Sequence, residues 1–248
     1  MTVTKVAVQP QRTEPILASA VAFDLDGTLL DTIHDLAGAV NALLMELGHT
    51  ALDTDIVRAF VGKGMANLVR RSLARAIGVS PEAIEDAEVK DALTRYQEHY
   101  AALLGRETRP FPRMIEGLDR LRAMGLPLAI VTNKASRFVR PHLDEAGIGD
   151  YFSVIVGGDD LPTKKPDPAQ LVHVAQRLGV ALPRLLMVGD SINDAQAARA
   201  AGCPVLLLPY GYNEGLAVQD VDADGIVATL ADVADRIQPV PIAAAPSR

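Results

Sequence analysis

The chain has 248 residues, a formal net charge of −7, 49% hydrophobic residues and one cysteine. This length can bury a sizeable core, and the hydrophobic content is too high for a disordered chain. The acidic balance and the lack of any lysine- or arginine-rich block argue against a nucleic-acid partner. No apolar run approaches the roughly 20 residues of a membrane helix. We therefore expect a cytoplasmic monomer or homodimer without nucleic-acid or membrane partners.

The two ends of the chain differ in composition from the rest. Residues 1–18 are polar, contain two prolines and include no apolar segment long enough for a signal peptide. Residues 239–248 are rich in proline and alanine. We expect a loose N-terminal tail over residues 1–18 and a disordered tail over residues 239–248.

Between these tails, short apolar runs alternate with amphipathic stretches. Each run is rich in valine, isoleucine or leucine and is bounded by glycine, proline or aspartate, which is typical of buried strands. The alternation predicts an α/β fold with a Rossmann-like parallel sheet covered on both faces. The expected strands are Ala20–Phe23, Leu126–Val131, Val154–Val156, Leu185–Val188 and Pro204–Leu208, and the expected helices are Met114–Met124, Ser136–Ala146, Ala169–Leu178 and Asp194–Ala201.

One region breaks this alternation with helical patterns alone. Apolar residues recur at helical spacing from Ile33 to Leu47, and further helical patterns follow after a break at Gly62-Lys63-Gly64. Two prolines close the region because they cannot continue a helix. We predict a helical domain of residues 33–110, inserted into an α/β core of residues 19–32 and 111–238.

Four polar clusters fall at the carboxyl ends of expected strands, where ligands bind in open parallel sheets. Asp24 and Asp26, in the first cluster, can divide the work of a nucleophile and a proton shuttle, and they offer oxygen ligands to magnesium. The alternative is an acidic turn that merely ends a strand. The clusters are Asp24-Leu25-Asp26-Gly27-Thr28, Thr132-Asn133-Lys134, Lys164-Lys165-Pro166-Asp167-Pro168 and Gly189-Asp190-Ser191-Ile192-Asn193-Asp194.

The other three clusters also allow two interpretations each. Thr132 and Asn133 form a strand-to-helix turn that can cradle a phosphate or simply cap a helix. Lys165 can neutralise a phosphate or lie in a solvated loop. Asp190 can complete a magnesium site, whereas Asp194 suits both a metal site and a helix N-terminus. Taken together, the four clusters supply what phosphoryl transfer requires.

In this order the clusters resemble the signature motifs of the haloacid dehalogenase superfamily of phosphatases, over about Val21 to Leu230. The helical insert is similar to the cap domain of that superfamily. Within it, the chain resembles the phosphoglycolate phosphatase branch, which makes 2-phosphoglycolate the expected substrate. The segments that carry this second resemblance are Phe23–Thr32, Val61–Gly64, Gly157–Asp159 and Tyr210–Tyr212.

The resemblance implies a role for each cluster. Asp24 would form an aspartyl-phosphate, and Asp26 would protonate the leaving oxygen and then activate water. Magnesium would be held by Asp24, the backbone carbonyl of Asp26, and Asp190. The remaining implied roles are phosphate binding by Thr132, Asn133 and Lys165, orientation of the metal site by Asp194, Thr28 and Ser191, and substrate specificity in the cap by Gly62, Lys63 and Gly64.

Some alternatives stay open on the sequence alone. Lys63 can meet the far end of a substrate or lie exposed in an ordinary turn. A phosphosugar phosphatase, a β-phosphoglucomutase-like mutase and a pyrophosphatase share the expected site, and a phosphorylated receiver module is an alternative that is not an enzyme. Asp26 argues against a dehalogenase, which lacks it. Arg113 stands where relatives often have glycine, and the five histidines are expected at the surface or at helix caps.

Overall fold

Within residues 14–242, which the computed structural model describes, a six-stranded parallel sheet forms the centre of the protein. Its strands are β2 (Ala20–Phe23), β5 (Leu128–Val131), β6 (Phe152–Val156), β7 (Leu185–Gly189), β8 (Val205–Leu207) and β9 (Gly225–Ile226). The strand order is β6-β5-β2-β7-β8-β9. β2 lies between β5 and β7, and Phe23 is paired with Ile130 and Val188. The predicted α/β class with a parallel sheet is confirmed.

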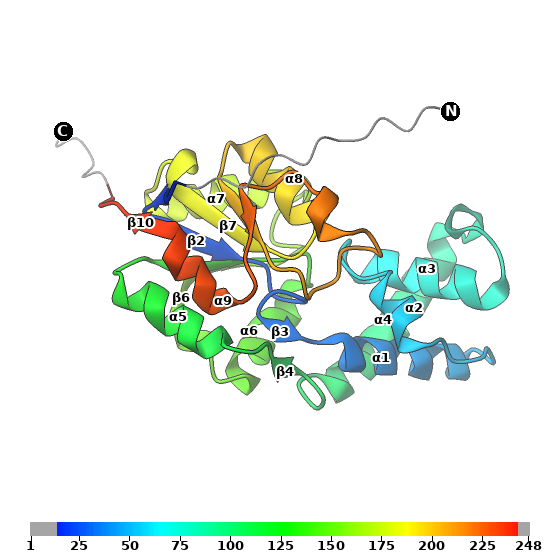
Figure 1. Ribbon diagram of the computed structural model, residues 1–248. Helices are drawn as coiled ribbons and strands as arrows, with labels where there is room; N and C mark the ends of the chain where they lie inside the picture. The colour runs from blue at the N-terminus through cyan, green and yellow to red at the C-terminus, as the bar shows by residue number, and fades with distance from the viewer. Residues whose placement is uncertain (1–13, 243–248) are drawn as a thin grey trace.

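Helices cover the sheet on both faces (Figure 1), and the side chains of its strands alternate between two cores. In β2, Val21 and Phe23 join one core, whereas Ala20 and Ala22 join the other. The first core is covered by α5 (Met114–Ala123), α6 (Ser136–Glu145) and α9 (Leu230–Val233), and the second by α7 (Ala169–Leu178) and α8 (Ile192–Ala201). Short 3-10 helices occupy Pro81–Ala83, Gly149–Tyr151, Leu182–Arg184, Val218–Asp220 and Ala234–Arg236.

A second, parallel pair of strands corrects the prediction for the two ends of the chain. β1 (Ile16–Ala18) pairs with β10 (Ile237–Pro239). Ile16 and Ala18 are buried, so the loose tail predicted over residues 1–18 is wrong for Ile16–Ala18. The disordered tail predicted over residues 239–248 is wrong for Pro239, which is paired with Ala18 in β10. The run is too short to stand out in the sequence, and its partner lies more than 200 residues away. The parts of both predicted tails in residues 1–13 and 243–248 lie outside the described residues.

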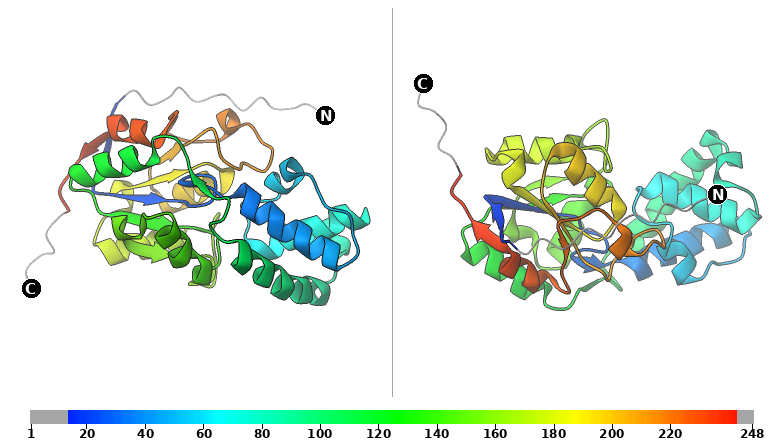
Figure 2. Two further views of the ribbon diagram at one scale, coloured as in Figure 1. Left: turned by 90° about the horizontal axis from the view of Figure 1, so that it is seen from below. Right: turned by 45° about the horizontal axis from the view of Figure 1, so that its top comes forward.

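The inserted region consists of four α-helices in the described chain, and they pack around a core of their own. In Figures 1 and 2 these helices stand to one side of the sheet, beyond the carboxyl ends of its strands. They are α1 (Ile33–Glu46), α2 (Thr54–Arg58), α3 (Met65–Ile77) and α4 (Asp86–Leu103). The helical cap is therefore present, and we retain residues 33–110 as its proposed extent.

The chain enters and leaves the cap at one place. β3 (Leu30–Asp31) and β4 (Arg109–Pro110) form an antiparallel pair. Beside them, buried Asp35 accepts hydrogen bonds from the backbone amides of Gly105 and Glu107, both at 2.9 Å, and from Thr108 Oγ1 at 2.7 Å. The Asp35 carboxylate on α1 thus holds in place the segment that connects α4 to β4.

His142 belongs to the same junction and corrects a second prediction. It was expected at the surface or at a helix cap, but it is fully buried and its Nε2 lies 2.9 Å from Thr108 Oγ1. Burial, together with the nearby Lys134 ammonium, lowers the pKa of His142 from 6.5 to about 4.

No helix in the described chain is both long and apolar enough to cross a bilayer.

Arg113 occupies the position where a glycine was expected, and its backbone has the conformation that favours glycine. Its φ is +60° at the N-terminus of α5. Its guanidinium makes ion pairs with Glu116 at 2.7 Å and with Asp232 at 3.1 Å. Both pairs are partly exposed, so each contributes little. The two ion pairs therefore offset only a small part of the energetic cost of a positive φ at Arg113.

Arg113→Gly should exceed Arg113→Ala in free energy of unfolding by about 0.5–1 kcal/mol, because both changes remove the same ion pairs and only alanine keeps a β-carbon at positive φ. Urea unfolding measures the difference. The matched control is Arg75, an exposed residue inside α3, where alanine should be the more stable replacement. Equal stability of the two Arg113 variants would contradict the explanation.

Candidate active site

The four predicted clusters meet at the carboxyl edge of the sheet, around the ammonium of Lys165. This side chain is buried, and its Nζ lies 2.9 Å from Asp24 Oδ1 and 2.6 Å from Asp194 Oδ1. It also donates to the Val131 carbonyl at 2.8 Å. Asp24 follows β2, Asp194 lies in the first turn of α8, and Lys165 comes from the loop before α7. One buried cation therefore joins three of the four clusters.

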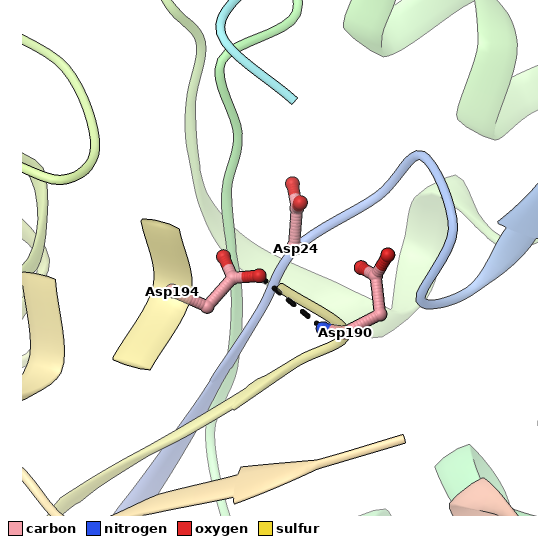
Figure 3. Close-up of side chains that lie close together, drawn as sticks. All are labelled: Asp24, Asp190 and Asp194. Atoms are coloured by element: carbon pink, nitrogen blue, oxygen red, sulfur yellow. Dashed lines mark hydrogen bonds between the residues drawn. The ribbon is translucent and has the colours of Figure 1, made fainter. Parts of the chain in front are cut away.

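Three carboxylates converge beside this cation (Figure 3). Asp24, Asp190 and Asp194 each offer an oxygen atom, and these atoms lie within 4.8 Å of one another. Asp194 Oδ2 accepts from Ser191 Oγ at 2.7 Å and from the amides of Ser191 and Asp190 at 3.1 and 3.2 Å. Asp194 thus caps α8 and at the same time orients the loop that carries Asp190.

Asp190 is held from two sides and fits tightly. Its Oδ1 accepts from Thr28 Oγ1 at 2.5 Å, and its Oδ2 accepts from the Tyr212 amide at 2.5 Å. A β-carbon built at Gly27 or Gly211 would lie 2.4 or 2.2 Å from Oδ2, so only glycine leaves room for this carboxylate. Burial and the neighbouring carboxylates raise its pKa well above the usual value.

Asp24 is also desolvated, but it keeps a counter-charge. Its Oδ1 accepts from the Leu25 amide at 2.7 Å. Burial raises the pKa of Asp24 from 3.8 to about 6; the Lys165 ammonium opposes this rise, and the Asp194 carboxylate adds to it. A carboxylate whose charged form is destabilised by burial, and which lies at a cavity wall, is suited to act as a nucleophile or metal ligand.

Asp26 lies in a different electrostatic environment. Its Oδ1 and Oδ2 accept from Lys134 Nζ at 3.0 and 3.2 Å. Burial alone would raise the pKa of Asp26, but the charges of Lys134 and, less strongly, His142 outweigh it, so the pKa is lowered. The pKa values of the two aspartates of the first cluster are therefore moved in opposite directions, and Lys134 favours the ionised form of Asp26, which can accept a proton.

Thr132 and Asn133 adjoin the cavity and also connect other parts of the site. Thr132 Oγ1 accepts from the Lys134 amide at 3.2 Å, which is a local turn and not a helix cap, because α6 begins after Ala135 and has no side-chain cap hydrogen bond. Asn133 Nδ2 donates to the carbonyls of Lys165 and Gly62, both at 2.8 Å. The Asn133 side chain therefore connects Gly62-Lys63-Gly64, here called the cap loop, to the loop that carries Lys165.

The cap loop closes the cavity, but its lysine points elsewhere. Gly62 and Gly64 line the cavity, whereas Lys63 is exposed and pairs with Glu214 at 2.9 Å. Glu214 also accepts from Asn193 Nδ2 at 3.1 Å. The full lining consists of Asp24, Asp26, Leu36, Val61, Gly62, Gly64, Met65, Leu68, Thr132, Asn133 and Lys134.

Three residues of the site had no assigned role in the sequence. Lys134 follows the predicted phosphate-binding pair directly, and that position was the available signal. The Tyr212 hydroxyl accepts from the amides of Thr32 and Ile33 at 2.8 and 3.0 Å, and so caps α1. Nothing in the sequence distinguished Glu214, because its partners come from distant segments.

Comparisons with known proteins agree with this geometry. The sequence model of the haloacid dehalogenase-like hydrolase family matches residues 21–208. Proteins named phosphoglycolate phosphatase from Thiobacillus denitrificans and Nitrosospira multiformis are 44% and 46% identical to the chain over 220 and 224 residues. These alignments cover 89% and 90% of this chain and 96% and 97% of the relatives.

The fold gives the same result. A crystal structure of a predicted phosphoglycolate phosphatase from Haemophilus somnus has a TM-score of 0.83 and 33% identity to the chain, and the match covers 88% of this chain and 97% of that one. The predicted resemblance is confirmed over most of the sequence. The chain belongs to the haloacid dehalogenase-like hydrolase family.

Proposed function

We propose that this protein is a phosphatase that hydrolyses 2-phosphoglycolate to glycolate and phosphate. The observation that carries the proposal is the placement of Asp24 and Asp26 in one cavity, with Lys165 on the first and Lys134 on the second. The names of the relatives at 44% and 46% identity support the choice of substrate. Phosphosugar phosphatase, mutase and pyrophosphatase remain alternatives for the experiment below.

The proposed reaction has two steps. Asp24 attacks phosphorus, the bond from phosphorus to the ester oxygen breaks, and Asp26 donates a proton to that oxygen. Asp26 then takes a proton from water, the water oxygen attacks phosphorus, and the bond to Asp24 breaks to release phosphate. Lys165, Thr132 and Asn133 would hold the phosphoryl oxygens, as the sequence predicts.

The donor set fits a magnesium ion. Three carboxylates lie close together, and the Lys165 ammonium pairs with two of them, Asp24 and Asp194. This excess of buried negative charge suits a divalent cation with oxygen ligands. We propose Asp24, Asp190 and the Asp26 carbonyl as the ligands. Both Asp194 oxygens already accept hydrogen bonds, which supports an orienting role, shared with Thr28 and Ser191. Bound magnesium would neutralise charge on the transferred phosphoryl group.

We retain the other expectations as proposals. Gly62 and Gly64 would shape the specificity of the cavity, and Lys63 would act there only after leaving Glu214. The protein would work in the cytoplasm as a monomer or homodimer, without nucleic-acid or membrane partners. A net charge of −7 and a single buried cysteine, Cys203, support this part of the proposal.

Phosphate release from a panel of small esters should be magnesium-dependent and highest with 2-phosphoglycolate, and Asp24→Asn should lower it at least about 10³-fold because the nucleophile is lost. The panel includes sugar phosphates and pyrophosphate. Preference for one of those would identify the corresponding alternative. Isomerisation of a sugar phosphate without net phosphate release would indicate a mutase, and full activity in the variant would refute the mechanism.

In metal-free protein, Asp24→Asn should raise the free energy of unfolding by about 1–3 kcal/mol at pH 7.5, because a raised pKa means that the ionised Asp24 destabilises the folded state. The folded wild type binds more protons than the unfolded chain between 3.8 and about 6, so its stability should fall as the pH rises through that window. Urea unfolding in EDTA measures both effects. A less stable variant would contradict them, and added magnesium should stabilise the wild type alone.

Gly211→Ala should weaken magnesium activation at least about tenfold, because the new β-carbon would overlap Asp190 Oδ2. The measurement is the magnesium concentration that gives half-maximal phosphate release. Gly202→Ala is the control, since a β-carbon there would have no neighbour within 4 Å. That variant is strained at its positive φ but should keep the wild-type magnesium dependence.

A further inference from the structure

Lys134 is a buried cation at the wall of the reaction cavity. Its side chain is 1% exposed, yet it lines the cavity together with Asp24 and Asp26. Among the lining residues in the described part of the chain, it is the only one with a positive charge. An anionic group that enters beside Asp26 would therefore meet this ammonium before any other.

The surroundings of Lys134 hold its ammonium in place through three acceptor atoms, two of which belong to one carboxylate. Nζ contacts both oxygens of Asp26 and donates to the hydroxyl of Tyr100, whose ring centroid lies 4.7 Å away. Tyr100 is a fully buried residue of α4, so the cap fixes the position of a core lysine. An ammonium has three donors, so an entering acceptor would take over one of the two contacts now made to the Asp26 carboxylate, and the other contact to Asp26 would remain.

Three other cations near the site have acidic partners. Lys165 is bound between Asp24 and Asp194, where the phosphoryl group is proposed to react. Lys63 and Arg71, both in the cap, share Glu214 at 2.9 and 3.6 Å. Neither of these two cap cations lines the cavity.

We propose that Lys134 binds the carboxylate of the substrate and thereby selects esters that carry an acid group next to the leaving oxygen. In 2-phosphoglycolate a single CH₂ separates the ester oxygen from the carboxylate. Because Asp26 must reach that oxygen and Lys134 Nζ lies 3.0 Å from Asp26, the lysine is within reach of the neighbouring carboxylate. This inference rests on the proposed function and adds the residue that determines specificity.

The test compares kcat/KM for three substrates. These are 2-phosphoglycolate, the monophosphate of ethylene glycol, which replaces the carboxylate by a hydroxymethyl group, and p-nitrophenyl phosphate, whose leaving group needs no proton. The wild type should prefer 2-phosphoglycolate over ethylene glycol phosphate by at least about 100-fold. In Lys134→Met this preference should fall below about fivefold, whereas Lys134→Arg should keep much of it because it keeps the charge.

Two further variants separate the possible explanations. Lys90→Met removes an exposed ammonium from α4 and should keep the wild-type preference. Lys63→Met asks whether the cap loop binds the carboxylate instead. Loss of the preference in Lys63→Met, with retention in Lys134→Met, would overturn the proposal.

A purely indirect role through Asp26 gives another pattern. Both alkyl esters would then slow together in Lys134→Met relative to p-nitrophenyl phosphate, and the preference between them would not change, which would also overturn the proposal. Folding is checked by thermal unfolding, and Lys134→Gln, which also removes the charge, replaces Lys134→Met if that variant is unstable. If the wild type itself shows no preference for 2-phosphoglycolate, the proposed substrate fails, which is a distinct outcome.

Discussion

The ammonium of Lys165, buried between Asp24 and Asp194, is the interaction on which the site depends. Two carboxylates could not remain ionised at this depth without a counter-charge. Through Asp194 the same contact reaches the N-terminus of α8 and the Asp190 loop. Removal of the lysine charge would therefore disturb the proposed nucleophile, the helix cap and the proposed metal site together.

The cap and the core are joined by polar groups that also belong to the site. Asn133 links the Gly62 carbonyl to the Lys165 loop, and Tyr100 contacts Lys134 from α4. Tyr212 binds Asp190 through its amide and caps α1 through its hydroxyl. Movement of the cap would change the surroundings of Asp24 and Asp26, so the position of the cap and the electrostatics of the cavity are coupled.

Sequence patterns located the large elements and the charged groups of the site well. The strand at Ala20–Phe23 and the helix at Ala169–Leu178 were predicted with their observed bounds, because both have strong periodicity and clear end signals. β1 and β10 were missed because each has three residues and its pairing partner lies at the other end of the chain. The contacts of Lys134, Tyr100 and Glu214 were not predictable, because each joins segments that lie far apart in the sequence.

The paired connectors of the cap have a consequence for how the chain folds. β2 must find β5 across about 100 residues of intervening sequence, and such long-range pairing slows folding. The helices of the cap have their own core and bring Leu30 beside Pro110. Once they are packed, the separation between β2 and β5 is reduced to two short connectors and α5. Folding of the insert would thus shorten the effective loop between β2 and β5 and favour early pairing of these central strands.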